Sequence, residues 1–453
     1  MQPIEKPCEK SYTMRNLKMQ WSKGTDNAVP HLLHFFSAND SNTVMTVMYR
    51  KGCVMRSFIL NENEMNELAK RQPTPFLVLS VDKVAENYAF LRKHLPRAGI
   101  YYAIKANPHP RALERLAALG SHFDVASAGE MEMLHAAGVD GSRMIYANPV
   151  HDARGFAAAS RFGVKRFTFD DESEIPKLAA AAPGADVLVR VQVHNSKVLV
   201  DLNTKFGAPL DEALPLLRKA EQAGLHAKGI CFHVGSQSLS TAAYEEALLL
   251  VHHLFLEAEA SGMHLTDLDI GGGFPIPSAE GLHVDLAAML EAINRQLDRL
   301  FPQTAVWTEP GRFLCGTAMN LVTSVIGTKQ RGAVPWYILD EGIYGVFSGI
   351  LFDHWTYPLH CFGNGVKTPS VFAGPSCDGI DVLYRDFPAP KLSIGANVLV
   401  SDIGAYTTVS ATRFNGFEPA TVLVWEDQSD LVAKRRKLRE ADEASSASIA
   451  QMS

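Results

Sequence analysis

The sequence predicts an α/β fold in which a TIM-like (β/α)8 barrel is followed by a C-terminal β domain. Between residues 99 and 313, eight short apolar runs alternate with stretches of helical spacing or with loops. After residue 313 helical spacing becomes scarce, and Gly and Pro separate short β-rich runs. A doubly wound open sheet is the structural alternative for the first block, because it shows the same alternation.

Residues 1–54 are mixed and poorly periodic, and we interpret them as a disordered or dispensable extension. The lead-in segment 55–98 contains a helical pattern at 62–71, a buried strand at 75–80 that could join the β domain, and a helix at 81–95. Barrel strands are expected at 100–104, 122–125, 143–146, 166–169, 187–193, 228–232, 266–270 and 305–308, and helices at 112–119, 130–137, 156–162, 172–180, 211–222, 244–260 and 286–300.

The β domain is expected to span 314–426. Beyond it, 427–453 form a charged tail, which we interpret as a solvated helix or a disordered end. The strands expected in the β domain are 321–326, 336–339, 370–373, 397–400 and 421–424.

Composition argues against several functional classes. The 453-residue chain has a net charge of -6, so it offers no basic excess for a nucleic-acid surface. No stretch approaches the roughly 20 apolar residues of a membrane span, and the N-terminus has no apolar signal core. The 6 cysteines show neither metal spacing nor disulfide density, and the 16 histidines contain no HExxH pattern. We therefore expect a cytoplasmic protein with no metal, nucleic-acid or membrane partner.

The chemistry is organised around Lys105, which ends the apolar run 101–104 and is followed by Asn107-Pro108. This pattern predicts a buried strand that delivers an amine to its C-terminal end. Burial lowers the pKa of a lysine, so we expect the free amine that Schiff-base chemistry needs. A strand-end lysine that reaches into solvent is the alternative.

Other polar residues also lie at predicted strand ends, where a barrel builds its active site. Gly271-Gly272-Gly273 follow the seventh strand, and three glycines leave backbone N–H groups free to approach an anion. Arg312 offers a cation at the next loop. A lysine beside a phosphate cradle indicates pyridoxal 5′-phosphate as the cofactor. The further candidates at these strand ends are Asp124, Glu130, Arg190, His233 and Glu309.

Several motifs resemble the fold-type III, alanine racemase-like pyridoxal-phosphate decarboxylases, and ornithine decarboxylases in particular. They occur in family order at family spacing over roughly 55–425. The four shared with the wider family are residues 102–107, 233–236, 269–275 and 309–313, and the three that resemble ornithine decarboxylases are 344–354, 374–378 and 404–406.

The resemblance implies a role at each matching position. Lys105 would bond the cofactor's aldehyde, Glu309 would face its pyridine nitrogen, and His233 would stack on its ring. The phosphate would be held by Ser236, Gly271, Gly272, Gly273, Arg312 and Tyr406. Gly311 would also bind the cofactor, and Asp124 and Arg190 would position it with help from Glu130.

The resemblance also implies a substrate site shared between subunits. Cys377 would give a proton to the substrate carbon after CO2 leaves, and Asp353 and Asp378 would hold the substrate's distal ammonium. In the family, the loop that carries Cys377 and Asp378 reaches the active site of the other subunit, so we expect a homodimer with two shared sites. Phe352 stands where ornithine decarboxylases often have Tyr, which affects the expected substrate length.

The expected reaction is the decarboxylation of L-ornithine to putrescine and CO2, a step of polyamine biosynthesis, with lysine as a second substrate. The alternatives are decarboxylases of D-ornithine, diaminobutyrate or another basic amino acid. Diaminopimelate decarboxylases usually show Cys-Glu where this chain has Cys377-Asp378. A racemase would not need that pair. A catalytically inactive regulatory homologue should have lost Lys105, Cys377 or the glycines, and all are present.

Overall fold

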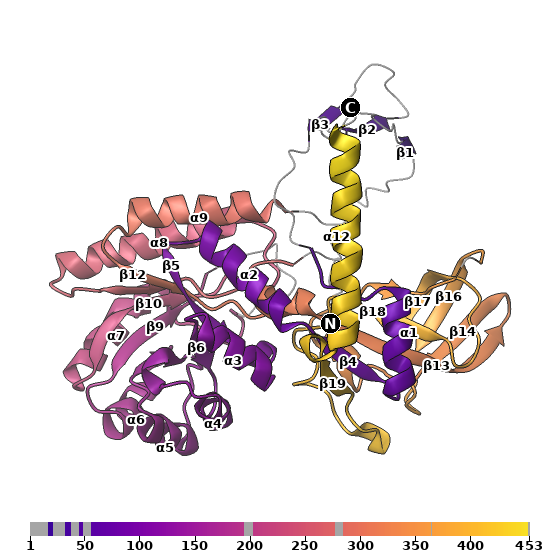
Figure 1. The fold of residues 1–453 in the computed structure, drawn as a ribbon. Helices are drawn as coiled ribbons and strands as arrows, with labels where there is room; N and C mark the ends of the chain where they lie inside the picture. The colour runs from indigo at the N-terminus through magenta and orange to yellow at the C-terminus, as the bar shows by residue number, and fades with distance from the viewer. Residues whose placement is uncertain are drawn as a thin grey trace, which may run out of the picture. The chain divides into compact units, whose positions relative to one another are not determined.

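Figure 1 shows the computed structural model of the chain. Before residue 56 only three short strands are described, and they form an antiparallel sheet in the order β1-β2-β3. Apart from these strands, the predicted extension 1–54 lies outside the described residues, so that interpretation stays a prediction. The described residues are 56–193, 203–276, 284–363 and 365–451, together with β1 (Leu17–Gln20), β2 (Leu32–Ser37) and β3 (Met45–Met48).

Eight parallel strands close into a barrel in the order β10-β11-β12-β5-β6-β7-β8-β9. The last barrel strand, β12, closes the ring on the first, β5, because Val306 lies opposite Ala98 and Thr308 opposite Ile100 in parallel register. The predicted (β/α)8 barrel is confirmed, and the open sheet is wrong. The strands are β5 (Ala98–Ala103), β6 (His122–Val125), β7 (Met144–Tyr146), β8 (Arg166–Phe169), β9 (Asp186–Val191), β10 (His226–Phe232), β11 (Asp267–Asp269) and β12 (Ala305–Thr308).

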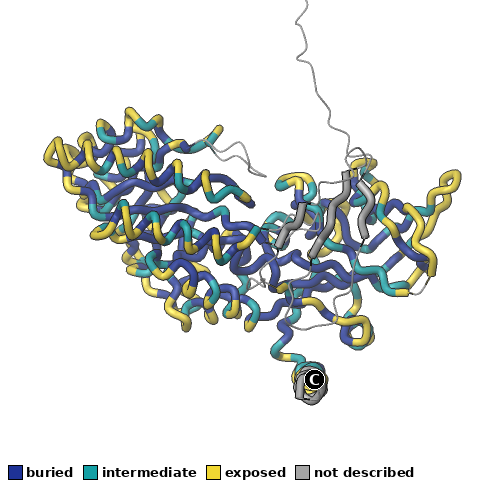
Figure 2. Tube along the Cα trace, turned by 90° about the horizontal axis from the view of Figure 1, so that it is seen from above, coloured by how far each residue is buried: buried dark blue, intermediate teal, exposed yellow. Residues whose placement is uncertain are grey.

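Barrel strands are recognisable in sequence because both of their faces are buried, which requires nearly continuous apolar runs. Figure 2 shows this burial along the strands, while exposed residues lie on the outer sides of the helices. One compact cluster consists mainly of strand residues, namely Tyr101, Ile145, Leu188, Cys231 and Trp307.

Helices cover the outside of the barrel. Several begin at a polar side chain that accepts a backbone N–H of the first turn, as Ser127, Asp152 and Asp285 do. The single helix expected at 211–222 is a 3-10 turn followed by an α-helix, and Pro215 lies in the first turn of that α-helix, where its missing N–H is tolerated. The helices are α2 (Val81–His94), α3 (Pro110–Ala118), α4 (Ala128–Ala136), α5 (Ala153–Phe162), α6 (Glu174–Ala181), η3 (Leu210–Glu212), α7 (Ala213–Gln222), α8 (Thr241–Ala260) and α9 (Leu286–Leu300).

A second sheet follows the barrel in the order β15-β18-β13-β14-β16-β17. β4 (Phe76–Leu79), which precedes the barrel in the chain, pairs antiparallel with β13 and parallel with β19. The sequence did not indicate β15 or β17, and β17 carries Arg385, Asp386 and Pro388, as an edge strand can. The strands are β13 (Met319–Arg331), β14 (Val334–Leu339), β15 (Leu359–His360), β16 (Thr368–Ala373), β17 (Val382–Ala389), β18 (Asn397–Val400) and β19 (Thr421–Val424).

Two helices that are far apart in the chain, α1 (Glu62–Arg71) and α12 (Ser429–Gln451), both pack beside β4. Leu431 of α12 is 2 % exposed, and the guanidinium of Arg435 lies 4.5 Å from the ring of Trp425 and pairs with Glu64. The charged tail is therefore a helix whose first turns are anchored.

The remaining short helices are η1 (Ile104–Ala106), η2 (Gly141–Arg143), α10 (Arg312–Cys315), η4 (Gly316–Ala318), η5 (Val346–Ser348), α11 (Gly349–Phe352), η6 (Phe414–Gly416) and η7 (Trp425–Asp427).

Candidate active site

The C-terminal ends of the barrel strands bring together the predicted lysine and its carboxylates. Lys105 lies in η1 directly after β5, and its Nζ donates to Oδ2 of Asp124 on β6 at 2.8 Å. The Asp124 side chain is 1 % exposed, whereas that of Lys105 is 48 % exposed where it lines a cavity. The structure thus holds an amine at the barrel mouth against a buried carboxylate.

The structure does not favour the free amine that was expected at Lys105. Desolvation lowers the pKa of Lys105, but the carboxylates of Asp124 and Glu309 outweigh it and raise this pKa above its usual value. Lys105 is therefore an ammonium at neutral pH, and the predicted pKa lowering is wrong. Burial could be inferred from the sequence, whereas the charges of partners that follow other strands could not.

Glu309, which follows β12, is paired with a carboxyl group that the sequence argument left without a role. Burial, and then the neighbouring Asp269 and Asp124, raise the pKa of Glu309 well above its usual range. Burial likewise raises the pKa of Asp269, whose Oδ1 accepts the N–H of Gly271 at 2.8 Å. Two adjacent buried carboxyls resist double ionisation, so this pair retains a proton. Asp269 ends β11, and its position two residues before Gly271 is the sequence signal that could have identified it as a site residue.

His233 provides a neutral ring in the same region. Burial, together with the positive charges of Arg190 and Lys105, lowers the pKa of His233 to about 3. Its Nδ1 accepts the N–H of Gly235 at 2.9 Å, so the proton of the neutral ring lies on Nε2. Ser236 follows Gly235 and is half-buried in the same loop.

The triple glycine forms a tightly packed turn. The carbonyl of Gly271 accepts the N–H of Glu309 at 2.8 Å, and that of Gly273 accepts the N–H of Ser238 at 2.8 Å. A Cβ on Gly271, Gly272 or Gly273 would lie 2.2–2.4 Å from a backbone carbonyl oxygen. Only glycine fits at these positions, and with the carbonyls engaged the turn is suited to present N–H groups to an anion.

Arg312 begins α10, and two aromatic rings lie against its guanidinium. Its guanidinium carbon is 5.1 Å from the ring centre of Trp355 and 5.0 Å from that of Tyr406. Its Nη2 donates to Oδ2 of Asp353 at 2.5 Å, and the two side chains are 5 % and 20 % exposed. Arg312 and Asp353 were expected in different subsites, so their pairing was not predicted from the sequence.

Tyr406 approaches the barrel from the loop that follows β18. It has a positive φ of 57°, and its N–H donates to the carbonyl of Ala106 at 2.9 Å. A Cβ on Gly311 would lie 2.8 Å from the Tyr406 hydroxyl, so this glycine permits the close approach. Burial raises the pKa of Tyr406, which is therefore a neutral phenol.

The loop after β16 stands apart from the barrel mouth of its own chain. Cys377 is exposed, and its N–H donates to Oδ1 of Asn415 at 3.1 Å. Oδ2 of Asp378 accepts the hydroxyl of Tyr344 at 2.5 Å, and this hydrogen bond lowers the pKa of Asp378. Within the described part of one chain, neither side chain contacts Lys105.

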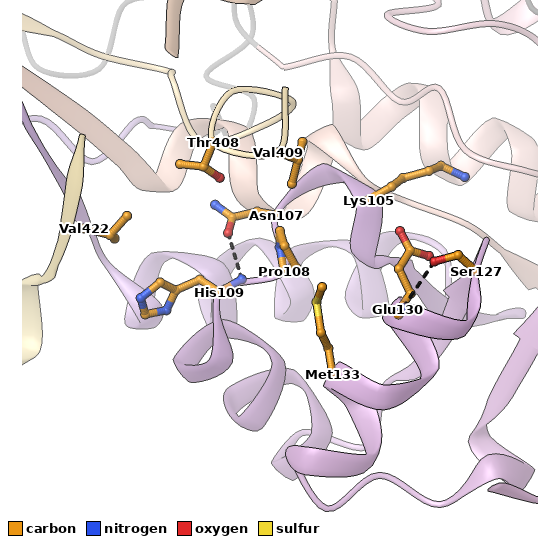
Figure 3. A pocket seen from close by; sticks show the side chains of 11 residues that line it. Lys105, Asn107, Pro108, His109, Ser127, Glu130, Met133, Thr408, Val409 and Val422 are labelled. Atoms are coloured by element: carbon orange, nitrogen blue, oxygen red, sulfur yellow. Dashed lines mark hydrogen bonds between the residues drawn. The ribbon is translucent and has the colours of Figure 1, made fainter. Parts of the chain in front are cut away.

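A cavity of about 750 Å3 opens beside Lys105 (Figure 3). Glu130, near the start of α4, accepts the N–H of Ala126 at 2.5 Å, and burial raises the pKa of Glu130 to about 7. The other residues lining the cavity are Asn107, Pro108, His109, Ser127, Gly129, Met133, Thr408, Val409 and Val422.

The residues at the barrel mouth fit a phosphorylated aromatic cofactor. In the described residues, several buried polar atoms there have no hydrogen-bond partner, namely Nε and Nη2 of Arg190, Oδ1 of Asp124, Oε1 of Glu309 and Nε of Arg312. Buried polar atoms rarely stay unpaired, so such a group points to a ligand. Cations beside a glycine turn suit a phosphate, and a protonated carboxyl pair suits a ring nitrogen.

A barrel with a strand-end lysine, a glycine turn and a following β domain defines a fold-type III pyridoxal-phosphate enzyme. Residues 81–316 match the family described as pyridoxal-dependent decarboxylase, pyridoxal binding domain. The chain belongs to this family of pyridoxal-dependent decarboxylases, which confirms the expected cofactor and class of reaction.

Relatives extend the match over most of the chain. The lysine/ornithine decarboxylase of Selenomonas ruminantium is 72% identical over 380 residues, which cover 84% of this chain and 97% of that protein. The chloroplastic ornithine decarboxylase of Nicotiana glutinosa is 34% identical, covering 77% and 83%.

Solved structures agree with this assignment. The crystal structure of lysine decarboxylase from Selenomonas ruminantium has a TM-score of 0.81 at 72% identity, covering 84% of this chain and 100% of that one. The lysine/ornithine decarboxylase of Vibrio vulnificus complexed with cadaverine has a TM-score of 0.76 at 34% identity, covering 81% and 99%.

Two features are absent from the described residues. They contain no group of three or more His, Cys, Asp or Glu side chains placed to hold a metal ion. They also contain no helix with the length and apolarity needed to cross a membrane.

Proposed function

We propose that this chain decarboxylates both L-lysine and L-ornithine, releasing cadaverine and putrescine with CO2. The observation that carries the proposal is the 72% identity to a lysine/ornithine decarboxylase over 97% of that protein's length. The structure with cadaverine from Vibrio vulnificus is similar over most of this chain as well. The sequence-based expectation was L-ornithine with lysine as a second substrate, and the proposal now gives the two amino acids equal weight.

Bound pyridoxal phosphate supplies an electron sink for the two electrons that decarboxylation leaves on the substrate's Cα. In our proposal Lys105 would hold the cofactor through its amine, and Asp124, whose Oδ2 lies 2.8 Å from that amine, would orient it. The Glu309–Asp269 pair retains a proton that it can share with the pyridine nitrogen. The neutral ring of His233 is the assigned cap on the cofactor face.

The phosphate site is assigned to the glycine turn and its neighbours. Cations and backbone N–H groups bind phosphate strongly where water is excluded, and Arg312 is 5 % exposed. Arg190 and Glu130 are assigned to orienting the cofactor from the edge of the site. The complete assignment for the phosphate is Ser236, Gly271, Gly272, Gly273, Arg312 and Tyr406, and Gly311 is assigned to the cofactor site beside them.

The proton for the product carbon is assigned to Cys377 of a second copy of the chain. Two observations support a second copy. Cys377 is exposed, and within the described residues of one chain its side chain does not contact Lys105. A thiol beside the Cα can donate the proton after CO2 leaves. Asp378 of that same loop and Asp353 are assigned to the distal ammonium, which makes the proposed unit a homodimer with shared sites.

A substrate panel tests the proposal. CO2 release is measured from L-lysine, L-ornithine, D-ornithine, diaminobutyrate and diaminopimelate at equal concentrations with pyridoxal phosphate present. We expect L-lysine and L-ornithine to be turned over with kcat/KM values within about 200-fold of each other, because one methylene changes discrimination by about 10- to 200-fold. No release from either amino acid refutes the assignment, and release from L-ornithine alone restores the narrower one.

A further inference from the structure

The ion pair between Arg312 and Asp353 joins two groups that the proposed function places in different subsites. Arg312 belongs to the phosphate site and Asp353 to the site for the distal ammonium. In the protein alone they bind each other, with Nη2 and Oδ2 separated by 2.5 Å. This ion pair therefore links the two proposed subsites directly.

Arg312 cannot move far from this position. The rings of Trp355 and Tyr406 lie on its guanidinium at 5.1 and 5.0 Å. A Cβ on Gly316 would lie 3.3 Å from Cγ of Arg312, so the stem of the side chain is closely packed too. A buried cation needs a counter-ion, and Asp353 supplies it. Nε of Arg312 is buried without a partner and leaves one edge of the guanidinium available to an anion.

The backbone of Asp353 is also fixed. The carbonyl of Gly349 accepts the N–H groups of both Asp353 and Trp355 at 3.0 Å. Gly349 packs against the Tyr357 ring, because a Cβ there would lie 2.2 Å from its hydroxyl. Because this backbone is held, the negative charge of Asp353 remains near Arg312 even if its side chain changes partner.

We propose that Asp353 is a shared counter-ion. It neutralises Arg312 when no phosphate is bound, and it binds the distal ammonium of the substrate or product when phosphate is bound to Arg312. The inference rests on the proposed function. A phosphate at Arg312 meets the charge of Asp353, and an ammonium at Asp353 cancels that repulsion. Phosphate and diamine therefore bind with positive coupling, and by linkage each strengthens the other by the same factor.

Inorganic phosphate is the probe, because without an aldehyde no imine with the diamine can form. Its dissociation constant is measured by calorimetry on the full-length, cofactor-free protein with and without saturating cadaverine. 1,5-Pentanediol serves as a neutral ligand of the same length. We expect cadaverine to tighten phosphate binding about fivefold or more, within the usual range of coupling between sites, and the diol to leave it unchanged.

Two variants locate the coupling. Asp353→Asn should bind phosphate more tightly than the wild type and lose the response to cadaverine. Asp386→Asn removes an exposed carboxylate of β17 that belongs to no proposed site, and it should behave as the wild type does. Phosphate binding with and without cadaverine is measured on the wild-type protein, so a misfolded Asp353→Asn protein does not prevent the test.

Equal phosphate affinity with and without cadaverine overturns the inference, and so does weaker phosphate binding by a folded Asp353→Asn protein, because Asp353 would then only position Arg312. The proposed function is checked separately, through the absorbance of lysine-bound pyridoxal phosphate and CO2 release. If both are present and the coupling is absent, the inference alone fails. If CO2 release is absent, the proposed function fails whatever the calorimetry shows.

Discussion

Replacing Gly273 by Ala tests whether the glycine turn holds its shape in order to bind the cofactor. Gly273 has a φ of +101°, and a Cβ there would lie 2.2 Å from the carbonyl oxygen of Gly235. A side chain in this sparsely populated region costs about 1–3 kcal/mol, and a forced shift of packed backbone costs about 1–3 kcal/mol more. We expect a loss of about 2–6 kcal/mol, divided between the free energy of unfolding and cofactor binding.

Gly262→Ala is the matched control for this experiment. Gly262 has a φ of +79°, and nothing lies within 4 Å of the position that a Cβ would take, so the same kind of backbone cost arises without a steric contact. Both variants are unfolded in urea, and the dissociation constant of pyridoxal phosphate is measured by equilibrium dialysis. Gly262→Ala should lose stability and keep its affinity. Gly273→Ala should lose more stability and bind the cofactor at least about tenfold more weakly, which is about 1.4 kcal/mol.

The two variants separate a structural turn from a binding turn. If Gly273→Ala is destabilised but binds pyridoxal phosphate as tightly as Gly262→Ala does, the glycines serve folding alone. If the two proteins are equally stable as well, the steric argument itself is refuted.

Three further predictions concern the site. Lys105→Ala should abolish the absorbance band of lysine-bound cofactor, whereas Lys70→Ala, on the exposed face of α1, should keep it; a band retained by Lys105→Ala removes that residue from its role. Cys377→Ala should divert product from diamine towards aldehyde, and mixing it with Lys105→Ala subunits should restore some activity, whereas no recovery argues against shared sites. Burial raises the pKa of Glu130 from 4.5 to about 7, so its protonation stabilises the cofactor-free fold below pH 4.5, and that contribution is lost as pH rises towards 7. Glu130→Gln should lack this loss in unfolding scans at about pH 5 and about pH 8, and an unchanged pH dependence contradicts the assignment.

The barrel could be predicted because its strands carry their own signal. A strand buried on both faces is an almost continuous apolar run, and β12, from Ala305 to Thr308, was located to the residue by that rule. β17 was not predicted from the sequence, for the opposite reason. Arg385 and Asp386 are exposed and Pro388 removes a donor, so the segment lacks the composition of a buried strand even though it pairs with β16.

The site was predictable as a set of positions, because the chemistry of a barrel gathers at its strand ends. Glycines after β11 and a lysine after β5 are visible in any strand-end survey. Asp269 was overlooked because a carboxylate within a strand looks like an ordinary polar residue. Its importance comes from Glu309, which follows a different strand and whose pKa it helps to raise.

The state of charge of the site depends on distances that no local pattern contains. Lys105 is an ammonium because Asp124, 19 residues away in sequence, lies 2.8 Å from its amine. Arg312 is neutralised by Asp353, 41 residues further on, in a segment that follows β14. Burial alone predicts the wrong sign for the first group and leaves the second with an uncompensated charge. Electrostatics in such a site is a property of pairs, so a sequence that predicts each member can still mispredict what the two do together.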